Sequence, residues 1–514
     1  MGREHSNDPG AIGGRSHPPT RHSSLAPILL LAAIAAMMLV GLDQGDLRQD
    51  PLVYGAVSKQ VWQSQQWDRL YFGADPYLNK PPLYFWVSAA LFQIGGPTPA
   101  MARLASILPG FAFILLLFAW LKNRGFPPAL AAVATLLVAL CPVFLEHATA
   151  GRLETLYLLG LIGGCWTLDH TRLPTLGRSL LLTAFATIGW LTKGPAALVY
   201  LPLWALLLPI PGMTASNLTR RLWLVMLAAN GIGALSFHLW WRHQHSLFGA
   251  GLMEATASRE FVNRFAVELS QLSGGIVYYL TKGLVGFFPI LVVSAGCWFA
   301  PRHRNPTAPT EPPAATPAGL SHWRPLLWIA VVVTPAILPE QPATRYLLPA
   351  LPALALLSCS LLQRCTNIVQ TAIIPLAGLV IVGAVAVELT PIPLHQSVPA
   401  QWRQALQHLP LQGESENVIP SVGPPHWELK AFLSYYGGGQ VRQVDPPELL
   451  AYPTGTWVLL QQQDFRRLPY LFDDHMEIDG WILARLNAES HPHPRTETGI
   501  PPLNANASGD SQAD

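Results

Sequence analysis

The chain has 514 residues, of which 50% are hydrophobic and only 12% are charged. Soluble domains carry about 25% charged residues, so this composition excludes an ordinary soluble protein and indicates a membrane protein. The formal net charge is +2, and the basic residues are scattered along the chain, so nothing points to a nucleic-acid partner.

Residues 1–24 are polar, and an apolar run follows from about Leu25 to Leu42. A cleaved signal peptide has a shorter apolar core that ends in a small-residue cleavage site. This run is longer and ends at Asp43 without such a site. The start of the chain therefore predicts a cytoplasmic N-terminal tail and a retained first transmembrane helix.

Apolar runs recur along the chain, and a bilayer-spanning helix needs roughly 20 such residues. We find about eleven candidate spans, at residues 25–42, 97–121, 127–145, 153–169, 178–191, 195–211, 221–241, 276–299, 324–338, 345–363 and 368–390. With the N-terminus placed in the cytoplasm, the basic residues of the short loops collect on the cytoplasmic side, as is typical of membrane proteins. The predicted fold is an all-α polytopic membrane body over residues 25–390.

Beyond this body the sequence becomes more polar. An odd number of spans places residues 391–487 outside the cytoplasm, and they predict a small α/β domain. Its predicted elements are a short helix at 402–409 and strands at 416–422, 439–444, 456–461 and 480–486. Residues 488–514, rich in His, Pro, Ser and Asn, predict a disordered tail. The Pro- and Thr-rich stretch 301–322 predicts a flexible cytoplasmic linker.

The first extracytoplasmic loop, residues 43–96, is much the longest loop and interleaves charged with aromatic residues. Lys80 in this loop, Lys193 and Arg345 each stand next to an apolar segment on the extracytoplasmic side. A single such cation is more commonly a side chain that reaches from a helix end to the interface. All three, however, fall on the side that membrane proteins keep poor in basic residues. Converging cations suit a lipid-linked phosphate.

Four blocks occur in order along the chain: Gly-Ala-Asp-Pro-Tyr-Leu-Asn-Lys-Pro-Pro at 73–82, Thr-Lys-Gly-Pro at 192–195, Val-Asn-Arg-Phe at 262–265, and Thr-Arg-Tyr-Leu-Leu-Pro-Ala-Leu-Pro at 344–352. Together they resemble the aminoarabinose-transferase and protein O-mannosyltransferase family, which includes dolichyl-phosphate-mannose-protein mannosyltransferases. The resemblance implies a GT-C fold of about 11–13 transmembrane helices, each spanning the bilayer, with a catalytic cavity on the extracytoplasmic side.

The resemblance also implies a function. The chain would transfer a sugar from undecaprenyl or another polyprenyl phosphate to a lipid such as lipid A, a glycan or a protein. It would act in the bacterial inner membrane, with membrane lipids around it and the active site facing outward. No cofactor is expected, and a divalent metal is left open. The five cysteines have no paired spacing and are interpreted as small apolar core residues.

The resemblance assigns roles to ten residues. Asp50 is the expected catalytic acid group, acting as a base or orienting the acceptor. Lys80, Arg264 and Arg345 are expected to bind the donor phosphate as its charge grows, with Lys193 a weaker candidate. The substrate path is expected to be lined by Tyr54, Tyr77, Tyr84, Glu154 and Tyr346. This chain departs from the family pattern at three positions. Pro51 and Asn79 stand where the family has acidic residues, and Glu154 stands where the family often has Asp.

Two other classes of function are alternatives to a transferase. A transporter or flippase for polyprenyl lipids predicts internal repeats and charges in the middle of helices, and the sequence has neither feature. A non-catalytic membrane scaffold predicts that replacing Asp50 or Lys80 leaves function intact.

Overall fold

The computed structural model describes residues 22–170, 172–208, 217–258, 272–299, 323–339, 342–363, 375, 379–380, 382–383, 397–409, 418–437 and 439–487. The chain divides into two compact units, Met1–Val398 and Pro399–Asp514. The predicted linker 301–322, the tail 488–514 and most of the predicted span 368–390 lie outside the described residues.

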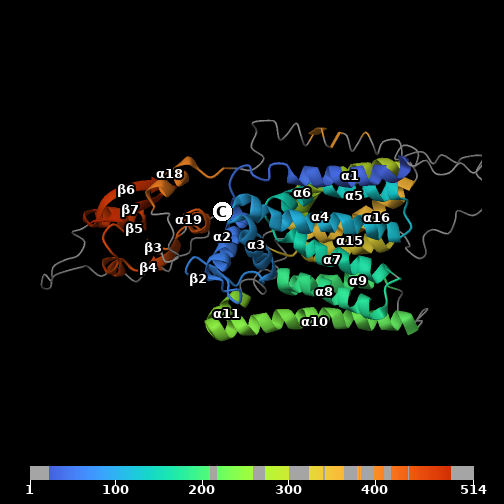
Figure 1. Cartoon of the computed structure of the whole chain (residues 1–514), viewed down its shortest axis with the longest axis horizontal. Coiled ribbons are helices and arrows are strands. Elements are labelled where there is room, and N and C mark those ends of the chain that lie inside the picture. The colour runs from blue at the N-terminus through green and yellow to red at the C-terminus, as the bar shows by residue number, and fades with distance from the viewer. Residues whose placement is uncertain are drawn as a thin grey trace, which may run out of the picture. The chain divides into compact units, whose positions relative to one another are not determined.

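The first unit is built from helices. They are α1 (His22–Leu39), α2 (Gln49–Ser64), α3 (Leu83–Gly95), α4 (Pro99–Asn123), α5 (Pro128–Ala139), α6 (Pro142–Thr149), α7 (Glu154–Asp169), α8 (Thr175–Lys193), α9 (Tyr200–Ala205), α10 (Asn217–Phe248), α11 (Ala250–Ala257), α12 (Leu272–Tyr278), α13 (Leu284–Gly286), α14 (Phe288–Phe299), α15 (Trp323–Ala336) and α16 (Leu351–Leu362). Shorter turns of helix are η1 (Gly194–Val199), η4 (Tyr279–Gly283) and η5 (Thr344–Ala350). The long helices run alongside one another, with α4, α7, α8 and α10 packed in that order (Figure 1).

Residues 43–96, predicted to be the first extracytoplasmic loop, are ordered by their own elements and by one buried arginine. They contain α2, α3 and the hairpin of β1 (Tyr71–Phe72) and β2 (Asp75–Pro76). Arg103 of α4 is 1% exposed and donates to the carbonyl oxygens of Leu42 at 2.8 Å and Asp46 at 3.1 Å. Because a buried guanidinium needs acceptors, this contact fixes the start of the loop just before α2.

Small residues bring α7 close to its neighbours. A Cβ atom added at Gly163 would lie 2.2 Å from Cδ1 of Phe185 in α8, and one added at Gly164 would lie 2.0 Å from Cζ2 of Trp204 in α9. Close approach through glycine is typical of helix pairs in membranes. This packing keeps the first residue of α7 near the last residue of α8.

Gly164→Ala is expected to lower the stability of the protein by about 1–3 kcal/mol, because the added methyl group overlaps a buried indole. The matched control is Gly231→Ala in α10, where no atom lies within 4 Å of the added Cβ. Thermal unfolding in detergent measures both variants. Equal midpoints for Gly164→Ala and the wild type would contradict the packing.

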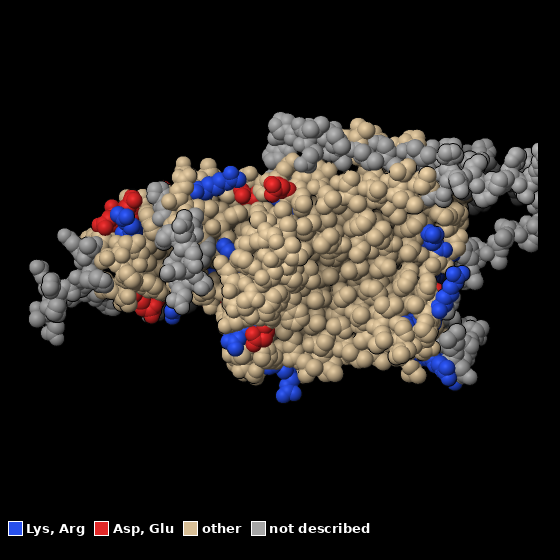
Figure 2. Space-filling view, in the orientation of Figure 1, with Lys and Arg blue, Asp and Glu red and all other residues tan. Residues whose placement is uncertain are grey.

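Membrane-spanning length is met by a subset of the helices. Within the described residues, three helices are long and apolar enough to cross a membrane, or up to five if each of two bent pairs forms one span. The bent pairs are Pro128–Ala139 with Pro142–Thr149, at 72°, and Ser273–Gly286 with Phe288–Trp298, at 85°. Figure 2 shows a broad face of the bundle with almost no charged side chain. The mostly helical, apolar character is confirmed, and the number of eleven spans stays a prediction.

The second unit contains a five-stranded sheet. Its strands are β3 (Val418–Val422), β4 (Gln440–Val444), β5 (Trp457–Gln461), β6 (Phe472–Ile478) and β7 (Trp481–Leu486), in the order β4-β3-β5-β7-β6. Strand β3 is parallel to β4 and β5, whereas β7 is antiparallel to β5 and β6. The helices are α18 (Ala400–His408), α19 (Trp427–Tyr435) and α20 (Gln462–Arg467). The four predicted strands and the predicted helix are present, while β6, α19 and α20 were not predicted.

Candidate active site

A cavity of about 470 Å³ lies within the helical unit. Six of the residues predicted for the site line it: Tyr54, Lys80, Glu154, Lys193, Arg345 and Tyr346. They come from α2, the first loop, the start of α7, the end of α8, and η5. Residues far apart in the sequence are thus gathered around one space.

Lys193 and Glu154 form a buried ion pair on one wall of the cavity. The Lys193 Nζ atom lies 3.2 Å from Oε1 of Glu154, and the two side chains are 14% and 5% exposed. Glu154 is the first residue of α7 and Lys193 the last of α8, so each charge opposes the helix-dipole charge at its own helix end. The ammonium also lies 5.1 Å from the centre of the Tyr157 ring, a cation–π distance.

The end of α8 is set by local sequence. Gly194 follows Lys193 with a φ of +59°, a conformation that favours glycine, and Pro195 cannot continue the helical hydrogen bonding. The helix therefore stops at Lys193 and holds its side chain at the cavity. This is the physical role of the Thr-Lys-Gly-Pro block.

A second ion pair joins the start of α2 to η5. Arg345 donates from Nη1 to Oδ2 of Asp50 at 2.8 Å, and the side chains are 29% and 40% exposed. Asp50 is not among the cavity-lining residues, but Arg345 is. The guanidinium also lies 5.7 Å from the Tyr346 ring. Arg345 therefore connects the accessible carboxylate of Asp50 with the cavity.

Residues 79–241 match the family described as dolichyl-phosphate-mannose-protein mannosyltransferase. Over these residues, about a third of the chain, the sequence is similar to this family of glycosyltransferases. The matched residues contain Lys80, Glu154 and Lys193. The resemblance predicted from the sequence blocks is thereby confirmed, and with it the class of enzyme.

Solved structures agree on the fold of the glycosyltransferase. ArnT from Cupriavidus metallidurans in the apo state is 16% identical, with a TM-score of 0.66 over 92% of this chain and 100% of that one. ArnT from the same organism bound to undecaprenyl phosphate is 17% identical, with a TM-score of 0.64 over 91% of this chain and 99% of that one. No curated protein sequence matches the chain. The comparison with ArnT shows a shared GT-C fold.

Of the three predicted tyrosines in the first loop, one lines the cavity and two pack against the aromatic residues around it. Tyr54 lines the cavity, and burial, reinforced by the charge of Asp50, raises the pKa of its phenol well above the usual value. The phenol therefore stays neutral and can donate a hydrogen bond. Tyr84 packs edge-on against Tyr54 with ring centroids 5.6 Å apart, and Tyr77 packs against Phe85 at 5.4 Å. Tyr77 and Tyr84 are not among the lining residues and lie behind Tyr54.

The cavity of the glycosyltransferase has an aromatic wall that was not predicted. Phe237, Trp240 and Trp241 of α10 line it, and the ring centroids of Phe237 and Trp240 are 6.1 Å apart. Their spacing of three and four residues puts them on one helix face, which is the sequence signal that could have found them. The same spacing is also typical of a helix face that contacts lipid, so it does not by itself predict a cavity wall.

One predicted site residue, Arg264, lies outside the described residues, so its role stays a prediction. Across the residues whose placement is described, no group of three or more His, Cys, Asp or Glu side chains could hold a metal ion.

Proposed function

We propose that this glycosyltransferase takes a sugar from a polyprenyl phosphate and transfers it, on the extracytoplasmic face, to a lipid, glycan or protein. The observation that carries the proposal is the meeting of Lys80, Lys193 and Arg345 at one cavity that is otherwise largely apolar. Cations in an apolar pocket suit a phosphate attached to a hydrocarbon chain. The structure of ArnT bound to undecaprenyl phosphate supports the same donor class.

In this proposal the bond between the anomeric carbon and the donor phosphate oxygen breaks as the acceptor oxygen bonds to that carbon. The electron pair leaves on the phosphate, whose growing charge Arg345 and Lys80 stabilise. A hydroxyl acceptor gives its proton to Asp50. An acceptor that is already an ionised phosphate needs no base, and Asp50 then orients it. A single displacement of this kind inverts the anomeric centre.

The aromatic wall provides a place for the lipid. Phe237, Trp240 and Trp241, with Leu198 and Val199 of η1, offer an apolar surface beside the cations. The first isoprenoid units of the donor would pack here, because burying their apolar area is favourable while the phosphate stays with the charged residues.

The distribution of basic residues supports the proposed orientation. Glu154 at the start of α7 and Lys193 at the end of α8 stand at the cavity, so the other ends of these helices point to the opposite side. Arg172 and Arg178 lie at that opposite side, between α7 and α8 and in the first turn of α8. Basic residues favour the cytoplasm, which supports a cavity on the extracytoplasmic side. The bacterial inner membrane is proposed from the resemblance alone.

The proposal is tested by transfer of radiolabelled sugar from polyprenyl-phosphate donors to membrane lipid and protein fractions. Lys80→Ala is expected to lower kcat/KM by about 10- to 100-fold, because a charge-assisted contact to the phosphate is lost. The matched control Lys122→Ala removes an exposed lysine from the far end of α4 and should transfer like the wild type. The labelled fraction identifies the acceptor class.

Equal transfer by Lys80→Ala and the wild type would contradict the phosphate-binding role. If folded wild-type protein labelled no fraction with any donor, the transferase assignment itself would fail, and the flippase and scaffold alternatives would be favoured.

A further inference from the structure

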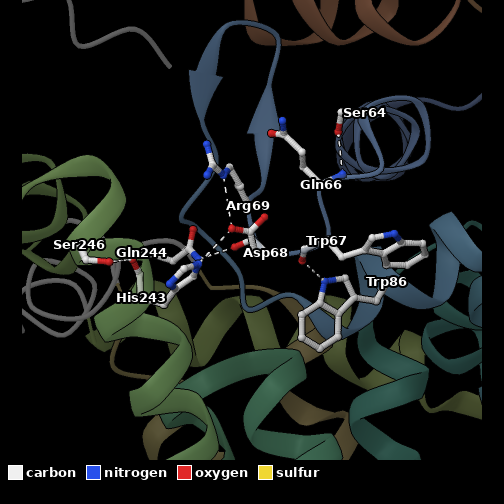
Figure 3. A network of polar contacts seen from close by, with 9 residues as sticks. All are labelled: Ser64, Gln66, Trp67, Asp68, Arg69, Trp86, His243, Gln244 and Ser246. Atoms are coloured by element: carbon white, nitrogen blue, oxygen red, sulfur yellow. Dashed lines mark hydrogen bonds and ion pairs between the residues drawn. The ribbon is translucent and has the colours of Figure 1, made fainter.

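The segment between α2 and β1 is bound to the last turns of α10. Asp68 is the centre of this contact (Figure 3): its Oδ2 atom lies 3.1 Å from Nε2 of His243, and its carbonyl oxygen accepts from Nε2 of Gln244 at 2.7 Å. Gln244 is fully buried. Two adjacent residues of α10 therefore bind both the side chain and the backbone of one loop residue.

Further contacts fix the same segment from both sides. Trp86 of α3 donates from Nε1 to the carbonyl oxygen of Trp67 at 2.7 Å, on the opposite side of the segment from His243 and Gln244 (Figure 3). Tyr71 packs edge-on against Phe248 at the end of α10, with ring centroids 5.6 Å apart. The segment is thus held between α3 and α10.

The elements joined by this contact form two walls of the cavity. Residues 78–81, which follow the β1–β2 hairpin, line it on the loop side, and Phe237, Trp240 and Trp241 line it on the α10 side. The backbone N–H of Tyr77 donates to the carbonyl oxygen of Leu70 at 2.8 Å, which couples the held segment to the residues just before Lys80. Gln244 follows Trp240 by four positions and Trp241 by three, so it lies on the same face of α10 as the wall that it would position.

The carboxylate of Asp68 is suited to this role at neutral pH. Desolvation would raise its pKa, but hydrogen bonds from His243 and Arg69 outweigh that effect and lower the pKa below the usual value. The group is therefore ionised. Asp68 and His243 are each about half exposed, at 47% and 45%, so their pair contributes little alone and acts together with the buried bond from Gln244.

We propose that Asp68, His243 and Gln244 are positioning residues. They fix the distance between residues 78–81, which include Lys80, and the aromatic wall of α10, and this distance sets the affinity for the lipid-linked sugar donor. They line no part of the cavity and act through Lys80, Trp240 and Trp241. The inference rests on the proposed function, because it assigns the donor to this cavity.

The test compares Asp68→Ala and His243→Ala with Arg69→Ala. Arg69 also contacts Asp68, at 3.4 Å between Nε and Oδ2, but belongs to the same segment and does not bridge to α10. We expect the KM for the polyprenyl-phosphate sugar to rise about two- to fivefold in the first two variants, with kcat within about 1.5-fold of the wild type. Arg69→Ala should keep both constants. The double variant should be no worse than the poorer single variant, because both remove one interaction.

A second measurement does not depend on turnover. Hydrogen–deuterium exchange of residues 67–81 should be faster in Asp68→Ala and His243→Ala than in the wild type and Arg69→Ala. Unchanged exchange, unchanged KM, or an equal rise of KM in Arg69→Ala would each overturn the inference. If the wild type transfers no sugar, the proposed function fails. Faster exchange in both variants would then still show that the contact between Asp68 and α10 exists, so the two failures can be told apart.

Discussion

Asp50→Asn is expected to lower kcat for transfer to a hydroxyl acceptor by about 100- to 10,000-fold, the range typical of a lost general base. The amide keeps the size of the side chain and can still accept the hydrogen bond from Arg345, so the geometry of the site is retained. What is lost is the negative charge and the ability to take a proton. Because Asp50 is 40% exposed, the thermal midpoint should change little.

The control for this variant is Asp75→Asn, which removes an exposed carboxylate from the same loop and should leave transfer unchanged. Steady-state kinetics with saturating donor measures kcat for both. A phosphate acceptor should show a much smaller loss in Asp50→Asn than a hydroxyl acceptor, since no proton needs to be removed. Full activity of Asp50→Asn with a hydroxyl acceptor would remove Asp50 from the mechanism.

Lys193→Met is expected to destabilise the protein by about 3–5 kcal/mol, because it leaves the carboxylate of Glu154 buried without its cation. Sugar transfer should also fall about 100-fold if the ammonium contacts the donor phosphate. Thermal unfolding in detergent measures the first effect, and transfer from labelled donor measures the second.

A double variant separates the two roles of Lys193. Glu154→Gln combined with Lys193→Met removes both charges and should recover most of the stability, since an apolar or neutral replacement of a buried pair is commonly tolerated. Transfer should remain low, because the cation is still absent. Recovery of transfer together with stability would show that the pair serves folding only, and the donor phosphate would then be assigned to Lys80 and Arg345.

Much of the fold could be predicted because the bilayer imposes simple rules on sequence. The helix α4, predicted at 97–121, is found at Pro99–Asn123, and the strand predicted at 439–444 is found at Gln440–Val444. Bends were not predictable in this way: hydropathy gives one run over 127–145, whereas the chain turns by 72° between α5 and α6. The bend lies at Cys141 and Pro142, where α6 begins with a proline in its first turn. The apolar run continues across these residues, so hydropathy does not reveal the bend.

The site was predictable as a set of residues and not as a set of pairs. Cations on the side poor in basic residues drew attention to Lys80, Lys193 and Arg345, and all three line one cavity. Nothing in the sequence indicated that Lys193 pairs with Glu154 and Arg345 with Asp50, because pairing depends on how helices pack. The contact of Asp68 with His243 was missed for the same reason, since 175 positions separate them.

The ion pair between Asp50 and Arg345 joins residues separated by 295 positions. In the orientation proposed above, the first loop crosses to the outer side of the membrane long before η5 has been synthesised. A nascent chain therefore exposes Asp50 without its partner until most of the helical unit has been inserted. If the proposed donor site is right, partly inserted chains lack part of it, and the ability to bind the donor arises only at the end of membrane insertion.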